Sequence, residues 1–291
     1  MDLEAIERAY SQGRYLSVLR KAQQWLQGGD VQRRTELLWL AGRAAYHLGD
    51  WEQAVRLLTA LLRAEGLPVR RTWQVRMWLA IALGQCGRLA EGEAMLLRLL
   101  SEEALDPDLR GKILYNLGWI YERQGNVDRA LAAYQQAARV LLDVNSVRDV
   151  VLALQNAAWL ALTEGLDEGA ELVRRAGAFV SQASEVQRVH QLALEALEAL
   201  LAGRCAEALQ TAEEILQPGH RWATDWDRAV AAFVVSASAA RQGLPPEIAA
   251  LFAQHAKRFA RRDGDERLLR LVGKPVPQHR YGGNQYGERE R

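Results

Sequence analysis

The stretch Ile113-Leu-Tyr-Asn-Leu-Gly-Trp-Ile-Tyr-Glu-Arg-Gln-Gly125-Asn-Val-Asp-Arg-Ala-Leu-Ala-Ala-Tyr-Gln-Gln-Ala-Ala138 decides the fold. Its pattern predicts two amphipathic helices that fold back on each other at Gly125. A glycine there can take the left-handed conformation that ends a helix, and Asn126 directly after it suits the cap of the next helix. Gly118 and Ala130 are small, so we expect the two helix axes to approach most closely at these residues.

The turn glycine recurs along the whole chain. The intervals are 36, 38, 38, 40, 38 and 40 residues, and the glycines are Gly13, Gly49, Gly87, Gly125, Gly165, Gly203 and Gly243. Seven residues before each of the last six stands a small residue, in the order Gly42, Ala80, Gly118, Ala158, Ala196 and Ser236. Signals for the start of a helix advance by a similar period, at Asp30, Leu67-Pro68, Asp106-Pro107, Ser146 with Asp149, Ser184 with Gln187, and Thr224 with Asp227. Seven helix pairs built from one repeating unit are therefore predicted.

This unit resembles a tetratricopeptide repeat. The residues that match the family's pattern are Leu114, Leu117, Gly118 and Tyr121 on the first helix, and Ala130, Tyr134 and Ala137 on the second. The resemblance implies an all-α fold, an α-α superhelix or solenoid of about seven helix pairs with a right-handed sense. We expect this solenoid over residues 1–262, a capping helix over 263–272, and a disordered tail over 273–291, which is polar and aperiodic.

Composition and motifs argue against several classes of function. The net charge of +1 gives no electrostatic reason to bind nucleic acid or an anionic membrane. No run of eighteen apolar residues and no signal peptide occurs, so we expect a cytoplasmic chain without a membrane contact. No catalytic or cofactor motif is present. Asp225 and Asp227, near His220, fit the first turn of a helix better than a metal site. We expect no enzyme, no cofactor and no metal.

Candidate binding residues lie on the first helix of each middle pair. In a stack of helix pairs the first helices line the concave face, and residues one step round from the packed stripe point into the groove. The residues at these positions are Trp39, Arg43, Trp78, Tyr115, Asn116, Trp119, Gln155, Asn156 and Trp159. They are our candidates for binding a peptide or protein partner.

One pattern recurs between adjacent pairs, because Asn116-Leu-Gly-Trp119 is followed forty residues later by Asn156-Ala-Ala-Trp159. An Asn amide can pair with both polar groups of an extended peptide backbone, and a Trp beside it offers apolar area with a donor tip. We expect the two asparagines roughly 10 Å apart on one concave surface. In the alternative interpretation, both tryptophans pack between adjacent first helices and both asparagines bond a neighbouring carbonyl. The sequence leaves both interpretations open.

The long repeat and the groove asparagines are also similar to the repeat domains of peptide-pheromone receptors from Gram-positive bacteria. In that family such asparagines hold a short peptide. Because the sequence starts directly with a repeat, we expect neither a helix-turn-helix module nor an N-terminal effector bundle. The prediction is a non-catalytic bacterial module, with a regulatory role, that binds a protein or peptide. The alternative is a homo-oligomeric scaffold that recognises its own copies through the groove or the end helices.

Overall fold

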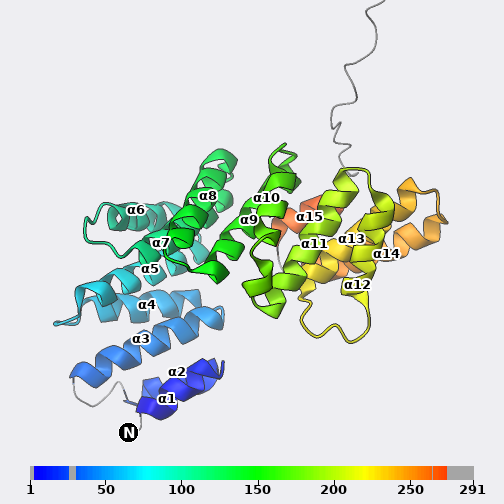
Figure 1. Cartoon of the computed structure of the whole chain (residues 1–291). Helices are drawn as coiled ribbons and strands as arrows, with labels where there is room; N and C mark the ends of the chain where they lie inside the picture. The colour runs from blue at the N-terminus through cyan, green and yellow to red at the C-terminus, as the bar shows by residue number, and fades with distance from the viewer. Residues whose placement is uncertain (1–2, 26–30, 264, 274–291) are drawn as a thin grey trace, which may run out of the picture. The chain divides into compact units, whose positions relative to one another are not determined.

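The computed structural model describes residues 3–25, 31–263 and 265–273, and these residues form fifteen α-helices and one 3₁₀ turn with no strand (Figure 1). The predicted all-α class is therefore confirmed. The chain divides into two compact units, residues 1–144 and 145–291, and each is described by itself. No helix among the described residues combines the length and the apolarity that a membrane crossing needs.

The first unit contains four helix pairs. They are α1 (Leu3–Ser11) with α2 (Tyr15–Trp25), α3 (Val31–His47) with α4 (Trp51–Leu62), α5 (Val69–Gln85) with α6 (Leu89–Leu100), and α7 (Pro107–Arg123) with α8 (Val127–Asp143). Each helix packs on its partner, and the second helix of one pair packs on the first helix of the next. The first helices, which we call A helices, also contact one another in the order α1, α3, α5 and α7. This order places the side chains of neighbouring A helices on one continuous surface of the unit.

The second unit contains three helix pairs and a short final helix. They are α9 (Val147–Glu164) with α10 (Gly169–Gly177), the 3₁₀ turn η1 (Val180–Gln182), α11 (Glu185–Leu201) with α12 (Cys205–Leu216), α13 (Asp225–Arg241) with α14 (Pro246–Asp263), and α15 (Glu266–Gly273). Helix α13 is apolar on nearly every side, and it contacts α11, α12, α14 and α15. Arg267 of α15 is buried and pairs with Glu164 at the end of α9. Apart from Gly273, the predicted tail lies outside the described residues.

Local signals in the sequence set the helix ends. The seven predicted turn glycines all have positive φ, and Gly125 has φ +76°. The side chain of Asn126 accepts a hydrogen bond from the Arg129 amide at 3.3 Å and so caps α8.

Capping boxes are confirmed at Ser184 with Gln187 and at Thr224 with Asp227. The signals at Asp106 and Ser146 also mark caps, whereas Asp30 lies outside the described residues. Pro68 differs slightly, because its extended ψ of 143° makes it the residue before α5 and not part of the first turn.

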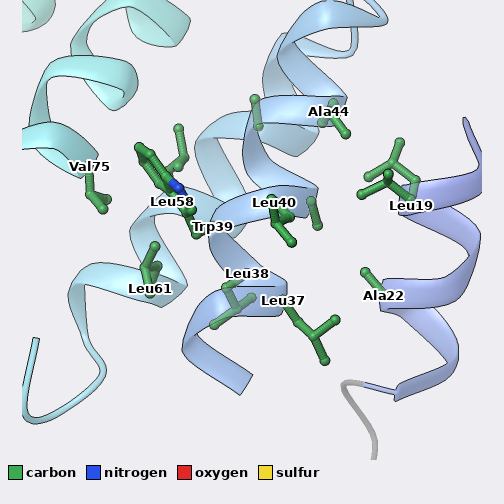
Figure 2. Packing of buried hydrophobic residues seen from close by; sticks show 14 of the residues in the cluster. Leu19, Ala22, Leu37, Leu38, Trp39, Leu40, Ala44, Leu58, Leu61 and Val75 are labelled. Atoms are coloured by element: carbon green, nitrogen blue, oxygen red, sulfur yellow. The ribbon is translucent and has the colours of Figure 1, made fainter. Parts of the chain in front are cut away.

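The small residues lie where helices meet. A methyl group added at Gly118 would come 2.6 Å from Cδ1 of Tyr134, and one at Gly42 would come 2.8 Å from Cδ2 of Leu58. Carbon atoms in contact are about 3.5–4.0 Å apart, so a methyl group at either crossing would force the neighbouring side chain or helix to shift. Figure 2 shows the resulting core around α3, where apolar side chains from α2, α3, α4 and α5 form one continuous cluster. The A helix α3 is thus fixed from both sides, which positions the side chains on its remaining face.

Candidate functional site

The nine candidate binding residues divide between the two units. Helices α3, α5 and α7 of the first unit carry Trp39, Arg43, Trp78, Tyr115, Asn116 and Trp119. Helix α9 of the second unit carries Gln155, Asn156 and Trp159. The two asparagines therefore belong to different units, and their spacing of roughly 10 Å stays a prediction.

Asn116 lies half-buried on α7. Its Nδ2 donates to the backbone oxygen of Lys112, one turn earlier in the same helix, at 2.7 Å. This bond is the local one that a polar side chain can make in the middle of a helix. The Oδ1 atom receives no hydrogen bond from the described residues and is not buried. Asn116 therefore still offers an acceptor to a molecule that approaches α7.

Asn156 makes the same intrahelical bond on α9. It is half-buried, and its Nδ2 donates to the backbone oxygen of Leu152 at 2.9 Å. In both repeats the Asn side chain thus bonds a carbonyl of its own helix. The shared sequence pattern is matched by a shared local conformation within each unit.

The aromatic side chains beside Asn116 are half-buried. The indole of Trp119 packs on α5, because a methyl group added at Gly84 would come 2.7 Å from its Cζ3. The ring centroid of Tyr115 lies 5.6 Å from that of Tyr134 in α8, so Tyr115 leans on the core of its own pair. Both rings keep part of their surface exposed. Together with Asn116 they form a mixed polar and aromatic surface on α7.

Gln155 and Trp159 of the second unit are buried, with 1% and 5% of their surface exposed. The Gln155 Nε2 donates to the backbone oxygen of Gln187 at 2.8 Å, which links α9 to α11. Trp159 meets Trp226 of α13 edge to face, with the ring centroids 4.8 Å apart. These two residues pack inside the unit, so a partner cannot reach them without a rearrangement.

Helices α11 and α13 also share a ring contact at Trp226 and a hydrogen bond beside it. The ring of His190 stacks on it at 3.9 Å, and the His190 Nδ1 lies 2.8 Å from Oδ1 of the fully buried Asp227. The other oxygen of Asp227 accepts from the backbone amide and the hydroxyl of Thr224, at 2.8 and 2.7 Å. Asp227 thus completes a capping box and anchors His190, which accounts for its burial.

The remaining candidates of the first unit lie in a cluster of rings that we call the aromatic box: Tyr10, Tyr15, Trp39, Tyr46, His47 and Trp78. The guanidinium of Arg43 lies among these rings. Its carbon Cζ is 4.6 Å from the ring centroid of Tyr10, 5.0 Å from that of Trp39 and 5.1 Å from that of Trp78. Cation–π attraction at such distances stabilises an arginine that has lost part of its hydration.

The surroundings of the aromatic box shift the pKa values of Arg43, His47 and Tyr10. Burial lowers the pKa of Arg43 from its ordinary value, and the nearby charge of Arg71 acts in the same direction. Burial also lowers the pKa of His47, with a further contribution from Arg43. The pKa of Tyr10 is raised, mainly by burial, and its hydroxyl lies 3.1 Å from Nε2 of His47. Burial thus favours the uncharged forms of His47 and Tyr10.

A separate cavity of about 600 Å³ lies between α4 and α6, over α5. Arg76 and Leu83 line it, whereas Trp78 points to the opposite side of α5, because residues two apart in a helix are about 200° apart around its axis. The wall also includes Leu62, Met95, Leu99 and Glu102. None of the nine candidate residues lines this cavity.

Three tetratricopeptide-repeat families match the chain, over residues 36–64, 73–143 and 115–179. The chain carries tetratricopeptide repeats. No curated protein sequence matches it significantly.

Solved structures with similar folds include a Rap protein complexed with Competence and Sporulation Factor. That similarity covers 89% of this chain and 73% of the Rap chain, with 14% identity and a TM-score of 0.62. The PlcR protein of Bacillus thuringiensis, in complex with the peptide PapR7 and DNA, is similar over 67% of this chain and 75% of its own, with 18% identity and a TM-score of 0.54. At these identities the likeness concerns the fold of the tetratricopeptide repeats.

The sequence pattern did not identify several residues in or against the aromatic box. Arg71, in the first turn of α5, has its Cζ 4.8 Å from the ring centroid of Trp39. Tyr10 and His47 come from the first repeat and from the end of α3. The repeat numbering gives no signal for these three, because they lie outside the periodic positions that face the groove. The tetratricopeptide repeats bring them together only through the packing of α1, α3 and α5.

Proposed function

We propose that the chain binds a protein or peptide partner through the A helices of its first unit, without catalysing a reaction. The proposed contact surface, which we call the A-helix stripe, consists of Arg43, Trp78, Tyr115, Asn116 and Trp119. Helix α5 contacts both α3 and α7, so these side chains belong to adjacent helices. All five are half-buried, and this mixture of aromatic area, Arg and amide is typical of binding hot spots.

The observation that carries the proposal is the free acceptor oxygen of the Asn116 side chain. A donor that approaches α7 finds its Oδ1 unbonded and not buried, directly beside the partly exposed rings of Tyr115 and Trp119. The backbone N–H groups of an extended peptide are such donors. The tetratricopeptide repeats support a partner-binding role, and two proteins of similar fold are complexed with the peptide PapR7 and DNA or with Competence and Sporulation Factor.

The matching proposal for the second unit rests on Asn156 alone. It has the same half-burial and the same intrahelical bond as Asn116. Its companions Gln155 and Trp159 are buried and contribute packing. We therefore expect Asn156 to add less to partner binding than Asn116.

The test compares single substitutions on the same samples. The partner is first identified by photo-crosslinking from Tyr115 in the cells that make the protein, and its affinity is then measured for Asn116→Ala and Asn156→Ala. Asn116→Ala should weaken binding by about 1–3 kcal/mol, the cost of leaving a buried peptide group unpaired. The melting temperature should change little, because alanine is the better helix former and offsets the lost bond to Lys112. An exposed amide on α8 provides the control, since Gln136→Ala should change neither quantity.

Two outcomes would contradict the proposal. In the first, Asn116→Ala lowers the stability by more than about 1 kcal/mol and leaves the affinity unchanged, so that the amide serves packing alone. In the second, Gln136→Ala and Asn116→Ala reduce the affinity for the crosslinked partner equally, so that the contact is not specific to the A-helix stripe and extends to α8.

An observation on α14 favours assembly with further copies as a second candidate function. Ile248 and Leu251 lie one turn apart on the last full helix, and 38% and 50% of their surface is exposed. Apolar residues at this spacing form one exposed stripe. If the stripe joins copies, native mass spectrometry should detect a dimer that Leu251→Glu converts to monomer. A wild-type protein that is monomeric at all concentrations would exclude this alternative.

A further inference from the structure

The short final helix α15 folds back over the second unit. It packs on α13 and α14 (Figure 1). Its Arg267 reaches Glu164 at the end of α9, a residue 103 places earlier in the chain. The last described helix of the chain therefore contacts both the first and the last helix pair of this unit.

Arg267 docks on the stripe of α9 that carries the candidate binding residues. Its Nη1 donates to the hydroxyl of Thr163 at 3.3 Å and pairs with Glu164. Thr163 follows Trp159 by four residues and Asn156 by seven, so these three side chains share one face of α9. We call Thr163, Glu164 and the side of α13 that contacts α15 the α15 surface. It continues the face of α9 that the repeat numbering assigns to a ligand.

Helix α15 meets this surface with two apolar side chains and one buried cation. Leu268 is fully buried, and Val272, one turn later, is 9% exposed. Arg270, on the other side of the helix, is exposed. Arg267 is as buried as Val272, and Glu164 offsets its charge. The α15 surface thus accepts a short amphipathic helix with an arginine in its first turn.

Few side chains hold α15 in place. Asp265 caps the helix, because its Oδ1 accepts from the backbone amides of Arg267 and Leu268 at 2.7 and 3.1 Å. A helix of eight residues is nevertheless unstable by itself in water. The burial of Leu268 and Val272 and the ion pair of Arg267 must therefore offset the entropy that is lost when the segment is ordered. A longer amphipathic helix would bury more apolar surface and so displace α15.

We propose that the α15 surface binds an amphipathic helix of a partner protein, and that α15 occupies this surface until the partner displaces it. The partner helix places apolar side chains where Leu268 and Val272 lie, and an arginine or lysine against Glu164. This inference goes beyond the proposed function, because the A-helix stripe belongs to the first unit and the α15 surface to the second.

The test uses a synthetic peptide of residues 265–273 with a fluorophore at its N-terminus. Fluorescence polarisation measures its affinity for the full-length protein. In the wild type the chain's own α15 competes, so the apparent affinity is reduced to the fraction of molecules in which α15 is released. Leu268→Asp releases α15 and should raise the affinity for the peptide about tenfold or more. Arg270→Gln is the matched control, because Arg270 lies on the exposed side of α15, and it should bind the peptide as weakly as the wild type does.

A charge reversal then locates the contact. In the Leu268→Asp protein, Glu164→Arg should lower the affinity for the peptide about tenfold, the loss expected for one charge-assisted contact. A peptide with glutamate in place of its first arginine should regain that affinity. A general loss of structure cannot produce this gain. If Leu268→Asp fails to fold, Arg267→Gln releases α15 in its place, because it removes the ion pair and keeps the apolar side chains.

Hydrogen exchange measures whether α15 opens alone. Its backbone amides should exchange at least tenfold faster than those of α13, because the rest of the unit stays folded when α15 is released. Equal exchange rates would show that α15 is a permanent cap and would overturn the proposal.

Two further results would also overturn it. In the first, the wild type and Leu268→Asp bind the peptide equally or not at all. In the second, the wild type forms a dimer that Leu268→Asp abolishes, because the α15 surface then takes α15 of a second copy. Neither result bears on the Asn116→Ala test, which probes the first unit, so the proposed function stands or falls separately.

Discussion

The crossing of α7 and α8 at Gly118 gives the sharpest test of the packing. Replacing Gly118 with alanine adds one methyl group, which would lie 2.6 Å from Cδ1 and 2.7 Å from Cε1 of Tyr134. Carbon atoms in contact need about 3.5 Å, so the ring or the helix must move by roughly 1 Å. The ring has no room, because Tyr134 is fully buried and its hydroxyl donates to Glu122 at 2.8 Å. The helices must separate instead.

The expected energy combines two opposing effects. Overpacking of this kind costs about 1–3 kcal/mol, and the change from glycine to alanine inside a helix returns about 1 kcal/mol. Gly118→Ala should therefore lose about 0–2 kcal/mol in the wild-type background. In a Tyr134→Leu background the ring is gone, and the same change should gain up to about 1 kcal/mol. The coupling between Gly118 and Tyr134 should thus be about 1–3 kcal/mol.

Urea unfolding followed by circular dichroism measures all four proteins of this double-mutant cycle. Gly177→Ala is the control, because the nearest atom to its added methyl group is Nε2 of Gln191, at 3.3 Å, a distance that needs a shift of only a few tenths of an ångström. It should be neutral or slightly stabilising. A coupling energy near zero would refute the reasoning, since the methyl group at Gly118 would then not feel the Tyr134 ring.

Two further changes test the helix cap and the aromatic box. Ser184→Ala breaks the capping box with Gln187 and should cost about 1 kcal/mol of unfolding free energy, measured by urea titration; an unchanged midpoint would show that the cap is dispensable. The pKa of His47 is lowered in the folded state by burial and by Arg43, so below its ordinary value of 6.5 the unfolded chain takes up a proton that the folded chain does not. Stability should therefore fall as the pH drops from 7.5 towards 5, and His47→Gln should lose that part of the pH dependence. If the melting temperatures of both proteins fall equally across this pH range, His47 is not the source of this pH dependence.

The repeat architecture could be predicted because its signals are local. A positive φ at Gly125 and a cap at Asn126 depend on a few consecutive residues, and the structure has both. The same holds for the capping boxes at Ser184 and Thr224. The close approach at Gly118 could also be predicted, because two helices joined by a short turn cross near a small residue. In the structure, Tyr134 of the partner helix fills the space there.

The exposure of the candidate residues could not be predicted in this way. Periodicity places Trp159 and Trp119 at equivalent positions, yet the first is buried against Trp226 and the second is partly exposed. The difference arises because α13 supplies a large ring to one position, and a residue nearly seventy places away leaves no mark on the local pattern of α9.

The sequence by itself determined the class of fold, the seven helix pairs and the ends of most helices, since turn conformation, capping and helical period are properties of short segments. Only the tertiary structure decided which side chains share a site. Arg43 of α3 contacts the ring of Tyr10 from α1, and Arg71 of α5 contacts the ring of Trp39, because α1, α3 and α5 pack in order. An unpaired arginine is visible only when all of its neighbours are known, because the absence of an acceptor depends on every helix that could have supplied one.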